Sequence, residues 1–202
     1  MAGDAGRVIA GSAAGRRLFA PGPGTRPLTD RVKQTLFAIL EPRLPGARFL
    51  DLCAGTGAGG IEALSRGAVA AVFVEQDGRT CKTIAENLVR TGLGGPAALV
   101  IRAEAGAWLL TGQRSPASAS SGPFDVVLLD PPYDQADLLE GLLATLGGPA
   151  AEGLLAAGAI VVAKHFWRAA PPARIGLLRS TRERRFGETT LTFYRRAGTE
   201  DG

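Results

Sequence analysis

The 202-residue chain carries a formal net charge of +4 and is 46 % hydrophobic, which suits one domain or one domain with a small lobe. Two cysteines, Cys53 and Cys81, are too few for a disulfide framework or a zinc site and favour an intracellular protein. No apolar run reaches the roughly 18 residues of a membrane span, and the N-terminus lacks the apolar segment of a signal peptide. We therefore expect a cytoplasmic protein without a membrane or a metal as partner.

The charge is distributed unevenly along the chain. Residues 1–45 carry a net +4, residues 46–163 carry −5, and residues 164–196 carry +7. Basic ends around an acidic middle favour a polyanionic partner that contacts both ends. The basic residues expected to contact phosphates on this ground are Arg7, Arg16, Arg17, Arg182, Arg184 and Arg185.

The first 45 residues predict a small N-terminal extension. Residues 7–20 read as a β-hairpin around a turn of small residues, and a Pro/Gly linker follows. Thr29 or Asp30 can cap a helix over residues 30–41 that ends at Pro42.

From residue 48 the pattern changes to alternating strands and helices. The predicted strands are 48–52, 68–76, 97–103, 124–130 and 158–166; the predicted helices between them are 59–67, 79–92, 105–110 and 136–147. Residues 174–186 and 189–196 read as a final antiparallel pair, and residues 111–122 as a flexible loop. This alternation predicts a doubly wound sheet whose site lies at the carboxyl ends of its strands.

Residues 55–60 form a G-x-G-x-x-G loop between a strand and a helix, as a nucleotide-binding loop should. Glu75 ends the next strand, twenty residues after Gly55, where it can accept both hydrogen bonds of a ribose diol. Either a nicotinamide dinucleotide or S-adenosylmethionine would fit this layout. Asp51, just before the loop, suits the ammonium group of S-adenosylmethionine and would repel a pyrophosphate.

The strand 124–130 ends in Asp130-Pro131-Pro132-Tyr133, here called the DPPY segment. A planar amine must regain sp³ character before it attacks a methyl sulfonium, and acceptors that hold its N–H groups out of the ring plane favour that change. The Asp130 carboxylate and the Pro131 carbonyl can be two such acceptors, which the prolines keep aimed. Tyr133 can stack on a base.

The DPPY segment resembles motif IV of amino-directed methyltransferases, and DLCAGTGAGGIEALSRGA (51–68) resembles motif I of the RsmD group in particular. RVIAGSAAGRRLFAP, TRPLTDRVKQTLF and RRFGETTLTFYR also resemble that group, so the resemblance covers most of the chain. RsmD enzymes methylate the N2 amine of a guanine in 16S rRNA, the RNA of the small ribosomal subunit. The resemblance implies a Rossmann-like class I methyltransferase sheet of seven strands, the last antiparallel, with an N-terminal hairpin.

The resemblance also implies roles for individual residues. Asp51, Gly55 and Gly57 would line the methionine end, Glu75 would hold the ribose, and Gln76 would lie beside the adenine. The full set expected at S-adenosylmethionine is Asp51, Cys53, Ala54, Gly55, Thr56, Gly57, Glu75, Gln76, Asp77, Glu104 and Ala105. The catalytic set is Asp130, Pro131, Pro132 and Tyr133, and the residues Arg26, Thr29, Arg31 and Lys33 would face RNA.

Two positions depart from the group. Ala103 precedes Glu104 where a glycine is usual, and the strand that often ends in Glu ends here in Ala163-Lys164-His165. We expect His165, the only histidine, to be structural.

These patterns divide the chain into an RNA-facing extension (1–45), a methyltransferase domain (46–196) and a flexible tail (197–202). The expected protein is a monomer that acts on ribosomal RNA, in an assembled or assembling small subunit. Three other functions stay open: methylation of an adenine or a protein glutamine, an NAD-dependent dehydrogenase, and an RNA-binding protein without catalysis.

Overall fold

The structure is a computed structural model, and it describes residues 3–20, 28–111 and 123–197. Arg26, the predicted loop after residue 111 and nearly all of the predicted tail lie outside the described residues. The chain forms two compact units, residues 1–104 and 105–202.

Unit 1 contains a three-stranded parallel sheet in the order β5-β4-β3. Its strands are β3 (Arg48–Leu52), β4 (Ala70–Glu75) and β5 (Ala98–Arg102), and its helices are α1 (Asp30–Leu40), α2 (Ala58–Ser65) and α3 (Gly78–Thr91). A short 3-10 turn, η1 (Glu41–Arg43), follows α1. Strands β3 and β4 are apolar on both faces, as parallel strands covered on two sides must be. Phe37, Phe49 and Phe73 are fully buried in this core.

The N-terminal hairpin of unit 1 consists of β1 (Gly3–Arg7) and β2 (Arg17–Ala20), which pair in antiparallel fashion. The hairpin begins at Gly3, earlier than the predicted start at residue 7. The predicted turn of small residues is part of a hydrogen-bonded loop at residues 8–16, in which Gly11 and Gly15 adopt positive φ. The loop also takes in residues 8–10, which the sequence assigned to the first strand.

Unit 2 contains five strands in the order β6-β7-β10-β9-β8. They are β6 (Phe124–Leu129), β7 (Leu155–Phe166), β8 (Arg174–Ile175), β9 (Leu178–Phe186) and β10 (Thr189–Arg196). Its helices are α4 (Ala105–Thr111), α6 (Ala136–Gly147) and the short η3 (Pro149–Ala151). Strands β6 and β7 are parallel, and β10 runs antiparallel to β7 and β9, as predicted for the last strand.

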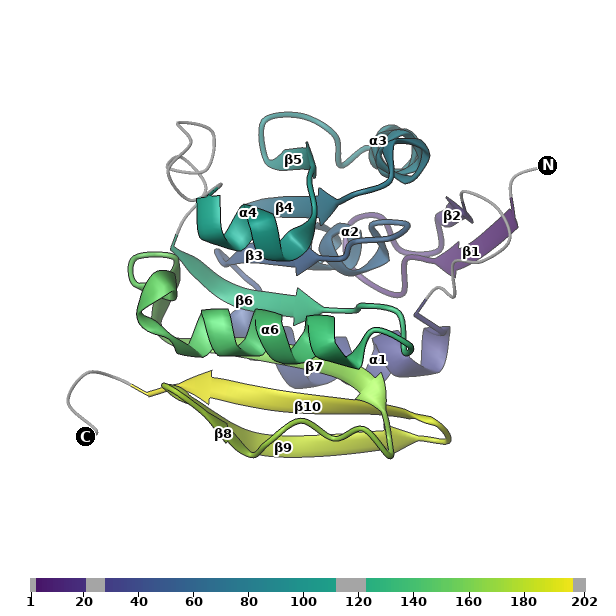
Figure 1. Cartoon of the computed structure of the whole chain (residues 1–202). Helices are drawn as coiled ribbons and strands as arrows, with labels where there is room; N and C mark the ends of the chain where they lie inside the picture. The colour runs from purple at the N-terminus through teal and green to yellow at the C-terminus, as the bar shows by residue number, and fades with distance from the viewer. Residues whose placement is uncertain (1–2, 21–27, 112–122, 198–202) are drawn as a thin grey trace. The chain divides into compact units, whose positions relative to one another are not determined.

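The predicted strand 174–186 is two strands, because Gly176 turns the chain between β8 and β9 with a φ of +54°. Apart from the hairpin, unit 1 has three strands and unit 2 has five. The sequence predicted seven strands, and the additional one is β8, which has two residues. Helix α6 packs on β7, β8 and β9. Figure 1 shows the long strands β7, β9 and β10 beside this helix, coloured from green to yellow.

Candidate active site

The glycine loop of unit 1, residues 53–57, leaves the carboxyl end of β3 and leads into α2. Gly55 and Gly57 adopt φ values of +55° and +76°, and Cys53 adopts +61°, the only positive φ of a non-glycine residue in the described parts. Such a conformation costs an L-residue of the order of 1–3 kcal/mol and is concentrated at functional sites. Gly60 has a different role, because a Cβ there would lie 2.3 Å from the Phe73 ring of β4.

The Asp51 carboxylate caps the helix that follows the loop. It is 2 % exposed, and its Oδ2 accepts the Gly60 N–H at 2.8 Å in the first turn of α2. An acid at a helix N-terminus complements the helix dipole. A pyrophosphate on this helix terminus would therefore meet a buried carboxylate, which disfavours a nicotinamide dinucleotide.

The Glu75 carboxylate lies at the end of β4 and connects two loops. Its Oε2 accepts the Gly55 N–H at 3.0 Å, and its Oε1 accepts the Asp77 N–H at 2.9 Å. A carboxylate has about four acceptor positions, so these bonds leave capacity for two hydroxyl donors. Together with Asp51, unit 1 thus offers carboxylates that suit an ammonium group and a diol, which is the donor set of S-adenosylmethionine.

The other predicted cofactor residues differ in their surroundings. Asp77 caps α3 by accepting the N–H and the hydroxyl of Thr80, both at 2.8 Å, and these hydrogen bonds lower the pKa of Asp77. Ala54 donates its N–H to Val74, and the Thr56 carbonyl accepts from the buried Asn87 amide. Gln76 and Glu104 are exposed, whereas Ala105 is buried at the start of α4 in unit 2.

The DPPY segment of unit 2 follows β6, and Asp130 forms a hydrogen-bonded ion pair with Lys164 on the neighbouring strand β7. Both side chains are largely buried, with exposed fractions of 16 % for Asp130 and 11 % for Lys164. Lys164 Nζ contacts Oδ1, so Oδ2 is the carboxylate oxygen that this lysine leaves for another donor. Burial raises the pKa of Asp130, and the adjacent Lys164 ammonium opposes that rise.

Tyr133 is fixed by contacts on two sides. Its hydroxyl shares a 2.5 Å hydrogen bond with Thr189 at the start of β10, and Lys164 Nζ lies 4.8 Å from its ring centroid. The Phe166 ring lies 6.3 Å away at a tilt of 48°. One lysine thus holds both the acid and the aromatic ring of the DPPY segment.

A small pocket adjoins this segment. Its walls include Pro131, Pro132, Tyr133, Leu139 and Phe166, with Lys164 and His165 as basic members. His165 itself uses Nδ1 at the Phe166 carbonyl and Nε2 at the Thr192 hydroxyl, both at 2.9 Å, which agrees with a structural role.

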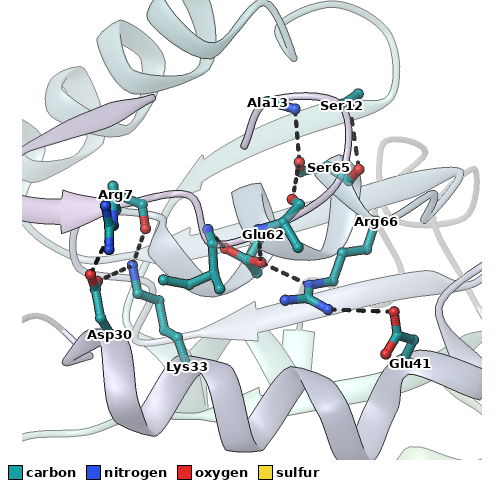
Figure 2. Close-up of polar contacts among 11 residues, drawn as sticks. Arg7, Ser12, Ala13, Asp30, Lys33, Glu41, Glu62, Ser65 and Arg66 are labelled. Atoms are coloured by element: carbon teal, nitrogen blue, oxygen red, sulfur yellow. Dashed lines mark hydrogen bonds and ion pairs between the residues drawn. The ribbon is translucent and has the colours of Figure 1, made fainter. Parts of the chain in front are cut away.

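Lys33, expected at an RNA surface, has a different environment. It is fully buried, its ammonium donates to the Arg7 carbonyl, and it pairs with Asp30 at 3.5 Å (Figure 2). Burial lowers the pKa of Lys33. Because this cation is used inside unit 1, it joins α1 to the hairpin and is not placed to contact a phosphate.

The other predicted RNA-facing residues of unit 1 lie at its surface. Arg7 pairs with Asp30 at 3.2 Å, and Arg16 donates to the Arg90 carbonyl at 3.0 Å. Arg17 and Arg31 are exposed. Thr29 caps α1 by accepting the Val32 N–H, so it has the capping role that its sequence position also predicted.

In unit 2, Arg182, Arg184 and Arg185 are all exposed on β9. The Arg185 guanidinium stacks 3.9 Å from the Trp167 ring centroid and donates to the Gly187 carbonyl at 2.9 Å. Arg184 donates to the Glu183 carbonyl at 2.7 Å. These contacts leave the arginine run at the surface and orient one of its members.

Sequence reasoning missed the residues that anchor the N-terminal hairpin. Glu62, 1 % exposed on α2, accepts the N–H groups of Ile9 and Ala10 at 2.7 and 3.1 Å and pairs with Arg66 at 2.7 Å (Figure 2). Asn87 on α3 exchanges hydrogen bonds with Phe19. Their signal in the sequence is weak, because one polar residue in an amphipathic helix ordinarily predicts surface.

Asn87 also has a direct connection to the glycine loop. The same side chain that bonds to Phe19 in β2 donates to the Thr56 carbonyl at 2.9 Å. The hairpin and the loop therefore share one buried amide.

No helix in the described parts is long and apolar enough to cross a membrane. Several known proteins are similar to this chain in sequence. It is 37 % identical to "Putative rRNA methyltransferase YlbH" of Bacillus subtilis over 95 % of this chain and 100 % of that protein. It is 38 % identical to "Ribosomal RNA small subunit methyltransferase D" of Escherichia coli over 74 % of this chain and 72 % of that protein.

Solved structures agree with the sequence relatives. "Putative methyltransferase yhhF" from Escherichia coli superposes with a TM-score of 0.80 at 31 % identity, over 96 % of this chain and 99 % of that one. This likeness confirms the Rossmann-like methyltransferase fold that the sequence predicts. Residues 6–195 match the family described as "Conserved hypothetical protein 95", and the Bacillus relative is similar in sequence over 95 % of this chain. The chain therefore belongs to that family.

Proposed function

We propose that the protein transfers a methyl group from S-adenosylmethionine to the exocyclic N2 amine of a guanine in small-subunit ribosomal RNA. The observation that carries this proposal is the DPPY segment with its buried, lysine-held carboxylate. The names of the Bacillus and Escherichia relatives supply the class of substrate. The carboxylates of Asp51 and Glu75 supply the acceptors that S-adenosylmethionine requires.

Bound S-adenosylmethionine supplies an electrophilic methyl group on a positively charged sulfur. The guanine nitrogen forms the new N–C bond as the C–S bond breaks, and the electron pair of that bond stays on sulfur. Asp130 Oδ2 and the Pro131 carbonyl accept the two N–H groups of the amine, which favours the sp³ nitrogen that attacks. One proton then leaves the methylated nitrogen, and water or Asp130 accepts it.

Lys164 acts in this scheme as a positioning residue. Its ammonium fixes Asp130 Oδ1 and favours the charged carboxylate, which burial alone would disfavour. Its position 4.8 Å from the Tyr133 ring also orients the surface on which a base can stack. Near its end, strand β7 has Lys164 where the related enzymes often have Glu, and this lysine places a cation beside Asp130.

The decisive experiment is methyl transfer from labelled S-adenosylmethionine to small ribosomal subunits that lack the modification. Label in one guanine of the small-subunit rRNA, located by mass spectrometry, supports the proposal. Label on an adenine, on protein glutamine or on DNA would assign a different acceptor. Binding of NADH in place of S-adenosylmethionine would support a dehydrogenase.

A parallel assay with naked rRNA addresses the form of the substrate. Because the target base must leave its stack to reach the DPPY segment, we infer that it is accessible in an assembled or assembling subunit. A higher rate on subunits than on naked rRNA is the expected result. We infer that the enzyme acts as a cytoplasmic monomer, which sedimentation with and without subunits would test.

A further inference from the structure

Three arginines lie side by side across strands β8, β9 and β10. Arg174 pairs with Arg179, and Arg179 pairs with Arg195. Directly opposed residues of antiparallel strands share a face, with Cβ atoms about 4.5–5.5 Å apart, and like charges there are destabilising. All three are exposed, and none forms an ion pair within the residues that the structure describes.

This row borders an open groove of unit 2. The groove is lined by Ala157, Gly158, Arg179, Thr181, Arg195, Arg196 and Ala197, so that three of its seven residues are basic and none is acidic. We call it the arginine groove. Its only apolar side chains are alanines, which offer little to a protein partner, since stable protein interfaces need a buried apolar core.

Two further contacts shape the groove. A Cβ at Gly158 would lie 3.5 Å from Arg195 Nη2, so the glycine leaves space beside that guanidinium. Arg196 is anchored through Nη1 to the Leu155 carbonyl at 3.2 Å, while its buried Nε has no hydrogen-bond partner. The groove therefore combines one oriented arginine with two that are free to meet a ligand.

The groove is separate from the DPPY segment within unit 2. Thr189, which contacts Tyr133, pairs with Phe166, whereas Arg195 pairs with Ile160 at the other end of the same ladder. Six residues of strand at about 3.4 Å each place these rows about 20 Å apart. A ligand in the groove would not touch the amine-binding residues.

We propose that the arginine groove binds phosphates of the RNA backbone at a distance from the methylated nucleotide. The proposal rests on the proposed function, which supplies RNA as the substrate. Guanidinium groups match phosphate oxygens in bidentate geometry, and polar, positively charged, weakly apolar surfaces are typical of nucleic-acid contacts. A bound phosphate would also relieve the repulsion within the arginine row.

The test measures binding of a small-subunit rRNA fragment as a function of salt, for wild type, Arg179→Gln, Arg195→Gln and the double variant. The slope of log affinity against log salt should decrease by about 0.7–0.9 for each lost phosphate contact, and thus by about 1.4–1.8 in the double variant. Lys82→Gln, which removes an exposed charge on α3 outside the predicted RNA-facing residues, is the matched control and should leave the slope unchanged. The melting temperatures of the groove variants should equal or exceed that of wild type, because repulsion is removed.

Three outcomes would overturn the proposal: unchanged slopes in the double variant, an equal decrease in Lys82→Gln, or, in a parallel assay with polyglutamate, loss of polyglutamate binding without loss of RNA binding. The last would make the groove a site for an acidic protein. At saturating RNA the turnover of the double variant should match wild type, because the groove does not touch the reacting groups. If wild type binds RNA through the groove but methylates no rRNA, only the proposed function fails.

Discussion

The glycine loop of unit 1 and the DPPY segment of unit 2 hold their carboxylates in different ways. Asp51 and Glu75 accept backbone N–H groups, from Gly60 and from Gly55 and Asp77. Asp130 is held by a side chain, Lys164, which lies 34 residues away in sequence. The backbone donors come with the loop itself, whereas the lysine depends on the pairing of β6 with β7.

This difference has a chemical consequence. Backbone N–H groups do not titrate, so the donors to the loop carboxylates do not depend on pH. A buried acid paired with one cation has its charge set by a single replaceable group. We therefore expect unit 1 variants to alter cofactor affinity and unit 2 variants to alter turnover and its pH dependence.

The largest effect is expected for Asp130→Ala. Loss of the aimed acceptor should lower the rate of methyl transfer by about 10²–10³-fold, the size seen when one preorganised polar group is removed from an active site. RNA binding by this variant should persist. If the protein only bound RNA and did not catalyse methyl transfer, the variant would show no loss of function. The nearby exposed Asp134→Ala is the control and should retain full turnover.

Asp130→Asn separates the two possible roles of this residue. The amide keeps one oxygen acceptor and loses the charge and the basicity. Turnover well above that of Asp130→Ala would indicate an aimed acceptor, whereas equal turnover would indicate that Asp130 must take the proton.

Glu75→Ala should act on the cofactor. Removing a carboxylate that bonds a ribose diol loses charge-assisted hydrogen bonds of about 1.5–3 kcal/mol, so affinity for S-adenosylmethionine should decrease about 10–100-fold. Calorimetric titration measures this directly. Glu86→Ala, an exposed acid on α3, should bind as wild type does, and equal weakening in both would refute the assigned role.

Lys164→Met should move the pH dependence of turnover. Burial raises the pKa of Asp130 and Lys164 opposes the rise, so removing the lysine raises this pKa further. An opposite charge beside a carboxyl group favours its ionised form, so without the lysine the acidic limb of the rate profile should move to higher pH. Lys164→Arg retains the charge and should leave the limb near its original position.

The same variant predicts a change in stability against pH. The pKa of Asp130 is higher in the folded state than in the unfolded state. The contribution of Asp130 to the free energy of unfolding is therefore fully present below its unfolded-state pKa and is lost as the pH rises through its folded-state pKa. Lys164→Met should therefore lose more stability than wild type between mildly acidic and neutral pH. Urea denaturation at two pH values measures the difference, and a pH-independent loss would mean that only packing was affected.

The sequence predicted the features that depend on local patterns. The alternation of apolar runs with helix periods predicted the strands and helices of both units. The predicted cofactor and RNA roles of individual residues stay predictions. What local patterns could not predict were contacts between distant residues.

Lys33 and Lys164 illustrate that limit. Both are single cations next to apolar residues, and nothing in their local sequence shows that Lys33 meets the Arg7 carbonyl or that Lys164 meets Asp130. The row of Arg174, Arg179 and Arg195 is similar, because these residues become neighbours only through the register of β8, β9 and β10. Charge counts along the chain predicted a basic end but not which arginines adjoin.

The smallest expected effect concerns Cys53, the strained position of the glycine loop. Its φ of +61° disfavours any residue with a Cβ, so Cys53→Gly should be more stable than Cys53→Ala by about 0.5–1 kcal/mol, although glycine ordinarily destabilises folded proteins through its unfolded-state entropy. Comparing the two variants with each other removes the contribution of the thiol, which both lack. Urea denaturation gives the stability difference, and calorimetry with S-adenosylmethionine shows whether relief of strain changes affinity. If alanine proves the more stable, the loop is not strained at this position, and the backbone hydrogen bonds to Glu75 alone determine its shape.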